Sequence, residues 1–224
     1  MRCFGVAVNT LRTLFPMLRT RGLLFAALYT LCFLLALYLV LPVGEFIFFI
    51  GLLLTYMVSP AGKETIIPMA IGYGSSWWFV AIVFTAFDLL GSLFVALNFD
   101  LLVKIPHLGP WMHGFIAQSQ AYLEKNPWVG KLYYLAIVIY EMLLDGSAGI
   151  TGSLLGRIMG MSPMETVVCI LTGSLLGCFL FARASDLITS IVPRDRLLII
   201  SFAVFIGLTL FSFAARYLRN LKER

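Results

Sequence analysis

Long runs of hydrophobic positions without charge dominate the chain. Residues 22–44, 65–87, 166–182 and 197–215 contain no Asp, Glu, Lys or Arg. A helix needs about 20 apolar residues to cross a bilayer. The pattern therefore predicts an all-α integral membrane protein with about four full spans, at about 22–43, 75–103, 164–182 and 197–216.

Two further apolar segments are interrupted at their centres. Residues 45–74 contain "SPAGKETIIP", and residues 131–160 contain "DGSAG". Neither segment has room for two spans of about 20 residues. Each fits a re-entrant helical hairpin, whose non-helical tip is tolerated at membrane depth only where protein or water satisfies it. The two hairpins would enter from opposite faces and form an inverted repeat, and paired interruptions of this kind point to a transporter's binding site.

Glycines spaced by four positions accompany the second hairpin and the span after it. The motif "GSLLG" stands at 152–156 and again at 173–177. Small residues at this spacing let helix backbones approach closely in lipid. We expect these segments to pack tightly against neighbouring helices.

Basic residues gather at the two ends of the chain and set its orientation. We divide the chain into a basic, amphipathic N-terminal segment at 1–21, a single multi-pass membrane domain at 22–216 and a basic C-terminal tail at 217–224. Basic clusters that flank spans mark the cytoplasmic side. We expect a multi-pass protein of the cell membrane with both termini in the cytoplasm, where the basic ends can contact anionic membrane lipids.

Composition narrows the possible partners. The chain has 224 residues, of which 61% are hydrophobic and 12% charged, with a net charge of +5. An average soluble domain is about half apolar and about a quarter charged. Because no soluble domain carries the basic residues, nucleic acid is not an expected partner. The four cysteines and the pair His107 and His113 show no metal-ligand spacing, so we expect neither a metal site nor a cofactor.

Charges inside the interrupted segments are the candidate chemistry, because ionisable groups at membrane depth are costly and usually face a cavity. Glu64 is the first candidate for a proton-coupling acid, and Lys63 could contact an anion. The alternative is that Lys63 and Glu64 neutralise each other in a wet loop outside the membrane.

The second hairpin supplies another charged group. Glu141 and Asp145 are four positions apart and would share a helix face, where like charges favour proton retention by one of them. Arg157 suits a phosphate or carboxylate, although a structural Asp145–Arg157 ion pair is the alternative. Asp88 lies within the predicted span 75–103, where the alternative is a hydrogen bond to Ser92 or to the backbone.

The candidate site thus has two parts. The candidate proton-coupling residues are Glu64, Asp145, Glu141 and Asp88. The candidate substrate contacts are Lys63, Arg157, Gly62, Thr65, Thr151 and Ser153.

The segments "SPAGKETIIPMAIGYG" and "DGSAGITGSLLGRIMGMSPMETVVCILTGSLLG" resemble the small multi-drug export protein family, a branch of the DedA/SNARE-associated (VTT) superfamily. The similarity covers roughly residues 45–182. It implies two oppositely oriented re-entrant hairpins packed with spanning helices. It also implies transport of lipids or lipid-phosphate carriers, in some relatives with dependence on proton gradients. Lys63 precedes Glu64 here, whereas the family often has the acid first, and "AGIT" replaces the DedA-type Pro-Gly-x-Arg turn.

We therefore expect a transporter or flippase for an amphipathic or lipid-type anionic small molecule, with protons as a candidate coupling ion. The alternatives are a non-transporting membrane assembly factor and an intramembrane enzyme. Asp145-Gly146 lacks the residues that a CDP-alcohol phosphotransferase needs after it, so no enzymatic activity is expected. The sequence leaves open whether the protein forms a homo-oligomer.

Overall fold

The structure, a computed structural model, describes residues 22–58, 62–103, 125, 127–143, 147 and 149–222. This part of the chain forms eight helices and no strand. The helices are α2 (Gly22–Val40), α3 (Val43–Val58), α4 (Lys63–Gly72), α5 (Trp77–Val103), α7 (Pro127–Leu143), α8 (Ile150–Ile158), α9 (Pro163–Ile188) and α10 (Arg194–Lys222). The all-α class is confirmed for these residues, while the segments 1–21 and 104–124 lie outside them.

Within the described residues, three helices are long and apolar enough to cross a membrane. Their candidate spans are Trp77–Phe99, Pro163–Ile188 and Arg194–Ala214. They correspond to three of the four predicted spans. The fourth prediction, at 22–43, coincides with α2, whose apolar stretch Leu24–Val40 is shorter than the others. By length and composition, the described residues support three full spans, and the fourth predicted span is not confirmed.

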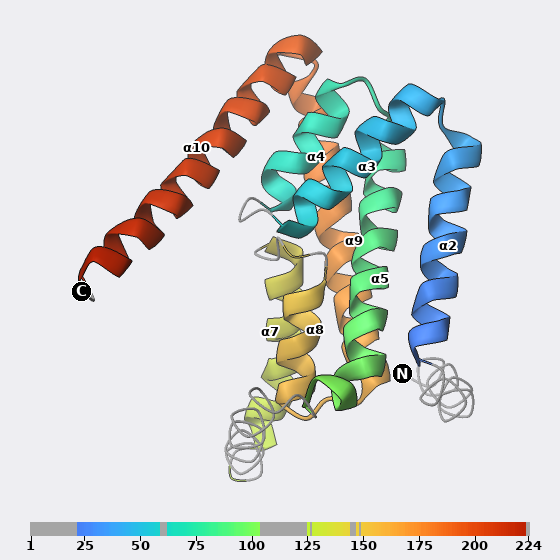
Figure 1. The fold of residues 1–224 in the computed structure, drawn as a ribbon, viewed down its shortest axis with the longest axis vertical. Coiled ribbons are helices and arrows are strands. Elements are labelled where there is room, and N and C mark those ends of the chain that lie inside the picture. Colours follow the sequence, from blue (N-terminus) through green and yellow to red (C-terminus); the bar gives the residue numbers. More distant parts are fainter. Residues whose placement is uncertain are drawn as a thin grey trace.

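Two pairs of short helices lie at opposite ends of the bundle. In Figure 1, α3 and α4 occupy the upper half and α7 and α8 the lower half, and the end of α3, the start of α4, the end of α7 and the start of α8 lie near mid-height. The long helices α5 and α9 run beside both pairs and pack against each other. The start of α10 packs against α4, and the rest of α10 leads away from the bundle.

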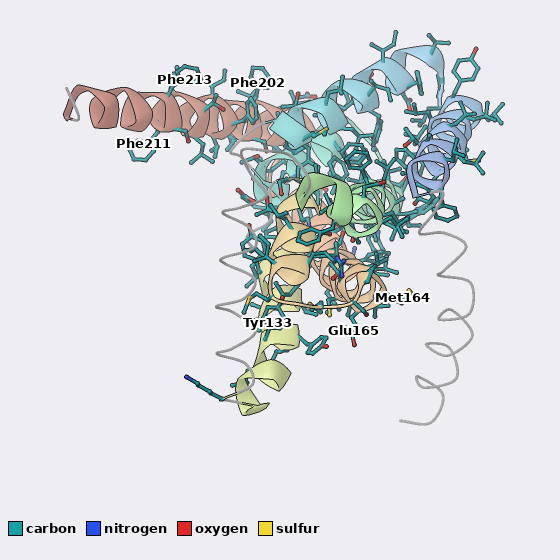
Figure 2. The ribbon with its side chains drawn as sticks, turned by 60° about the horizontal axis from the view of Figure 1, so that its bottom comes forward. Tyr133, Met164, Glu165, Phe202, Phe211 and Phe213 are labelled. Carbon is teal, nitrogen blue, oxygen red and sulfur yellow. The ribbon has the colours of Figure 1, made fainter. Side chains whose placement is uncertain are left out.

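The exposed surface of α10 is rich in large apolar side chains. Phe202, Phe211 and Phe213 project from α10 where it stands away from the other helices (Figure 2), and Phe211 and Phe213 are each 73% exposed. Exposed aromatic and aliphatic side chains of this density suit contact with lipid rather than with water.

The two halves of the bundle share a local pattern. Each short helix pair is followed by a long helix, first α3, α4 and α5, then α7, α8 and α9. Gly74 and Gly160 end α4 and α8 with positive φ angles of 116° and 93°, which a residue with a Cβ rarely adopts. In each turn the glycine N–H bonds to the carbonyl three residues earlier, and the next N–H bonds to the carbonyl five residues earlier.

The sequences of the two halves also match when they are aligned with an offset of 86 residues. This offset is the separation of Asp88 and Ser174, which are hydrogen-bonded to each other. At this register "DLLG" at 88–91 corresponds to "SLLG" at 174–177. The two halves run in opposite directions in Figure 1, because α5 descends where α9 ascends. The sequence repeat therefore has a structural counterpart.

Glycines of α9 allow the backbone of α7 to approach closely. A Cβ added at Gly173 would lie 2.5 Å from the Val138 carbonyl oxygen and 2.7 Å from Glu141 Cβ. A Cβ at Gly177 would likewise clash with the backbone of Met142. The expected tight packing around the second "GSLLG" is confirmed, and it places Glu141 inside the bundle.

Gly173→Ala is expected to lower the free energy of unfolding by about 1–3 kcal/mol, the usual cost of overpacking a core. The new methyl group would push α7 away from α9. Gly207→Ala is the matched control because nothing lies within 4 Å of its added Cβ, and alanine is the better helix former. Thermal unfolding of the purified protein in detergent measures both variants, and equal unfolding temperatures would contradict the prediction.

Candidate functional site

A buried lysine joins the two helix pairs at the centre of the molecule. Lys63 is the first residue of α4, and its Nζ lies 2.8 Å from Glu141 Oε1 on α7 and 3.0 Å from Asp88 Oδ2 on α5. Nζ also donates a hydrogen bond to the main-chain carbonyl of Glu141 at 2.8 Å. The Lys63 side chain is 2% exposed, and both carboxylates are fully buried. We call Lys63, Asp88 and Glu141 the buried ion cluster.

Asp88 accepts further hydrogen bonds from two other helices. Tyr56 on α3 donates its hydroxyl to Asp88 Oδ1 at 2.9 Å. Ser174 on α9 donates its hydroxyl to Asp88 Oδ2, and Cys178 Sγ lies 3.9 Å from the same oxygen. The cluster and its immediate partners therefore come from five helices that meet at one point.

Local packing explains why these side chains converge. Tyr56 belongs to the hydrophobic core that α3, α4 and α5 share, so its ring is held firmly and its hydroxyl points at α5. A Cβ at Gly149 would lie 2.5 Å from the Asp88 carbonyl oxygen, so the start of α8 approaches α5 as closely as a glycine allows. Gly152 and Gly173 leave the space that the Glu141 side chain occupies.

Charge balance in the cluster is incomplete when every group is ionised. Within the described residues, one ammonium group faces two carboxylates. Removing charges from water costs several kcal/mol for each ion, and only close pairing offsets that cost. A bound proton on one carboxyl would make the cluster neutral.

The first predicted site segment is divided between the interior and the surface. Glu64 is exposed, and its Oε1 accepts a hydrogen bond from the Gly62 N–H at 3.0 Å. Thr65 is buried and donates its hydroxyl to the Gly62 carbonyl at 3.1 Å. Glu64, Gly62 and Thr65 thus shape the start of α4, whereas Lys63 alone reaches the cluster.

The second predicted segment is also divided. Glu141 belongs to the cluster, and Asp145 lies outside the described residues. The hydroxyls of Thr151 and Ser147 are 2.6 Å apart in the first turn of α8. Ser153 is fully buried, and its hydroxyl has no hydrogen-bond partner among the described residues.

Arg157 lies at the other end of α8. Its guanidinium donates a hydrogen bond to the Met161 carbonyl and stands over the Phe99 ring, 5.0 Å from the centroid. It therefore contacts the lower end of α5 rather than the buried ion cluster. The two predicted anion contacts, Lys63 and Arg157, occupy separate places.

Two residues of the site were not among the sequence-based candidates. Tyr56 and Ser174 are uncharged, so a search for embedded charges passes over them. The 86-residue register would have pointed to Ser174, since it stands opposite Asp88 in "DLLG" and "SLLG". Nothing in the sequence marks Tyr56. His107 and His113 lie outside the described residues. Among the described residues, no group of His, Cys, Asp and Glu is arranged to hold a metal ion.

The described residues are helical, include three membrane-length apolar helices and enclose a buried ion cluster, which defines the class as α-helical membrane proteins. Residues 64–180 match the model of the small multi-drug export protein family, which is more than half of the chain, and the chain belongs to this family. The matched region contains Asp88, Glu141 and Ser174. Neither the curated proteins nor the solved structures contain a match.

Proposed function

We propose that the chain is a membrane transporter that moves an amphipathic or lipid-type anionic small molecule and couples this movement to protons through the buried ion cluster. The observation that carries the proposal is the contact of one lysine with two buried carboxylates at the junction of two helix pairs. The family's description as an export protein supports the transport class. The proposal assigns no enzymatic reaction to the chain.

The proposed membrane arrangement follows from the two short helix pairs. We take α3–α4 and α7–α8 as re-entrant hairpins of a DedA-type inverted repeat, entering from opposite faces of the cell membrane with both termini in the cytoplasm. Their meeting point near mid-height in Figure 1 would then lie close to the bilayer centre. Binding sites at such repeat interfaces are typical of secondary transporters.

Proton binding and anion binding would be linked through Lys63. With both carboxylates ionised, the negative charge around Lys63 exceeds its own charge and repels an anion. When one carboxyl takes up a proton, that excess disappears, so an anionic headgroup can approach Lys63 at lower electrostatic cost. Arg157, at the lower end of α8, is the proposed second contact along the route of the anion.

The proposal changes which acid is the main coupling candidate. The sequence favours Glu64, because it lies in an interrupted apolar segment. Its exposure and its bond to the Gly62 N–H fit a residue that stabilises the first turn of α4, where an acidic side chain is favourable. Asp88 and Glu141, which both face Lys63, are the stronger candidates.

Reconstitution in liposomes tests the proposal directly. We expect leaflet exchange of a labelled anionic lipid to accelerate when a pH gradient is applied, and Glu141→Gln to remove the effect of the gradient. Glu64→Gln, the matched control, should keep at least half of the wild-type rate. A labelled amphipathic drug anion, assayed in parallel, separates a lipid substrate from a drug substrate.

The outcomes distinguish the competing functions. A rate of lipid exchange that does not change with the pH gradient would contradict proton coupling and indicate a scramblase. No movement of either probe by a folded protein would contradict transport and favour an assembly factor. Loss of exchange in Glu64→Gln, with Glu141→Gln unaffected, would return the coupling role to Glu64.

A further inference from the structure

Two buried serines of the bundle have hydroxyls that no protein group engages. Among the described residues, the buried serines are Ser92, Ser153, Ser174, Ser185 and Ser201. The Ser174 hydroxyl bonds to Asp88, and the hydroxyls of Ser185 and Ser201 bond to the carbonyl four residues earlier in their own helices. The hydroxyls of Ser92 and Ser153 have no partner within the described part of the chain, and both residues are fully buried.

A buried hydroxyl without a partner calls for a physical explanation. Buried polar groups of folded proteins almost always bond to another protein group or to an ordered water molecule. A serine inside a helix commonly bonds back to the preceding turn, as Ser185 and Ser201 do. Ser92 and Ser153 do not bond back in this way, so their hydroxyls are available to another group.

The two serines stand at the same level of neighbouring helices. Gly149, which precedes α8, approaches α5 so closely that an added Cβ would lie 2.5 Å from the Asp88 carbonyl oxygen. Ser153 comes four residues after Gly149, and Ser92 comes four residues after Asp88. Residues four apart lie on the same face of a helix, about one turn further along. Both serines therefore lie one turn below the place where α8 touches α5.

A contact further down keeps the two helices together over this distance. Arg157 of α8 stands over the Phe99 ring of α5, 5.0 Å from its centroid. The contacts of Gly149 and Arg157 with α5 thus enclose the position of Ser153 on α8. In Figure 1, α5 and α8 descend side by side from the level of the buried ion cluster.

A water molecule suits this pair of hydroxyls better than an ion does. A hydroxyl can donate and accept, and a buried water bonds to about two to four polar groups that otherwise lack partners. An anion would be repelled by the two carboxylates of the buried ion cluster. A metal ion such as calcium takes about six to eight oxygen ligands, which is more than two hydroxyls supply.

The surrounding space also favours a small occupant. Gly152 precedes Ser153, and a Cβ added there would lie 2.6 Å from Ile170 Cδ1. This side of α8 is therefore filled by α9, and a group much larger than water would have to displace packed side chains.

We propose that Ser92 and Ser153 bind a water molecule between α5 and α8, one helical turn from the buried ion cluster. The site stands on the two hydroxyls and their positions. Its use, which is to give protons access to the cluster along the interface of α5 and α8, rests on the proposed function.

Water-edited solid-state NMR of the full-length protein in lipid nanodiscs tests the site without a transport assay. The serine Cβ carbons are labelled, and the signals are assigned from the spectra of Ser→Ala variants. We expect magnetisation from water to reach Ser92 and Ser153 at short mixing times. The buried Ser185 and Ser201 are the matched controls, because their hydroxyls are already bonded within their helices, and their signals should rise later.

Single substitutions show whether the two serines share the water. Ser153→Ala should slow the transfer from water to Ser92, and Ser92→Ala should slow the transfer to Ser153, because the water loses one of its partners. Ser201→Ala should leave both transfers unchanged.

Unfolding temperatures of Ser92→Ala, Ser153→Ala and the double variant give an independent readout. If one water links the hydroxyls, the first substitution already weakens its binding. The double variant should then unfold at a higher temperature than the sum of the two single shifts predicts. Two separate hydroxyls without a shared partner would give additive shifts. The better helix propensity of alanine adds equally in both cases and does not affect this comparison.

Three results would overturn the proposal. They are signals of Ser92 and Ser153 that rise no faster than those of Ser185 and Ser201, additive shifts in unfolding temperature, and stabilisation by sodium chloride over choline chloride that Ser153→Ala removes. The last result would assign the site to a sodium ion.

The proposed function fails separately from the water site. If water reaches both serines but lipid exchange in liposomes does not respond to the pH gradient, the site stands and the proton coupling is wrong. If water does not reach them but exchange responds to the gradient, the coupling stands and the water site is wrong.

Discussion

Lys63→Met is expected to lower the free energy of unfolding by about 3–5 kcal/mol, the cost of removing one partner from a buried ion pair. Methionine fills a similar space but removes the ammonium that pairs with both Asp88 and Glu141. Their repulsion would separate α5 from α7 at the junction of the two helix pairs. Denaturant or thermal unfolding of the purified protein in detergent measures the loss.

Lys125→Met provides the control for this variant. Lys125 is exposed, and surface substitutions usually change stability by less than about 0.5 kcal/mol. If Lys63→Met unfolds at the same temperature as Lys125→Met, the buried ion cluster does not contribute to the stability of the fold.

The triple variant Lys63→Met, Asp88→Asn, Glu141→Gln is expected to fold with nearly wild-type stability and to lose gradient-driven transport completely. Replacing a whole buried ionic group with well-packed hydrophobic residues of similar volume is often neutral or stabilising. Met, Asn and Gln are likewise uncharged and of similar volume, so this variant leaves no charge of the cluster without a partner. The amide oxygen of Asn can accept from one of the two hydroxyls, of Tyr56 or of Ser174, while its NH2 group donates to the oxygen of the other.

This variant separates the structural role of the cluster from its proposed function. Stability and leaflet exchange are measured on the same preparation, with Lys63→Met as the comparison. Recovery of stability without recovery of gradient-driven exchange is the expected result. Gradient-driven exchange in the triple variant would show that the proton is carried elsewhere, and failure to recover stability would show that the charges are needed for folding.

The interruptions in the apolar pattern lie beside the buried ion cluster. The polar centres of 45–74 and 131–160 coincide with the ends of α3, α4, α7 and α8, which meet near mid-height. Asp88 and Glu141 were both recognisable, because a carboxylate within an apolar run needs a partner. The first predicted span, 22–43, is not confirmed as a full span, and α2 ends at Val40 within it.

The sequence did not indicate which of two neighbouring charged residues faces the interior. Lys63 and Glu64 are adjacent, but successive residues of an α-helix point about 100° apart, so only one of them can face a given partner. The structure turns Lys63 inward and leaves Glu64 exposed. This direction depends on how α4 packs against α9 and α10, which no local pattern encodes.

The sequence by itself determined that this protein is helical, that it belongs in a membrane and that charged residues interrupt two apolar segments, because these properties follow from composition and spacing along the chain. The tertiary structure alone decided that Lys63 pairs with Glu141, 78 positions away, and that Asp88 meets Ser174, 86 positions away. Such contacts depend on how closely helices can approach. Here glycines on α8 and α9 leave the space in which Glu141 reaches Lys63.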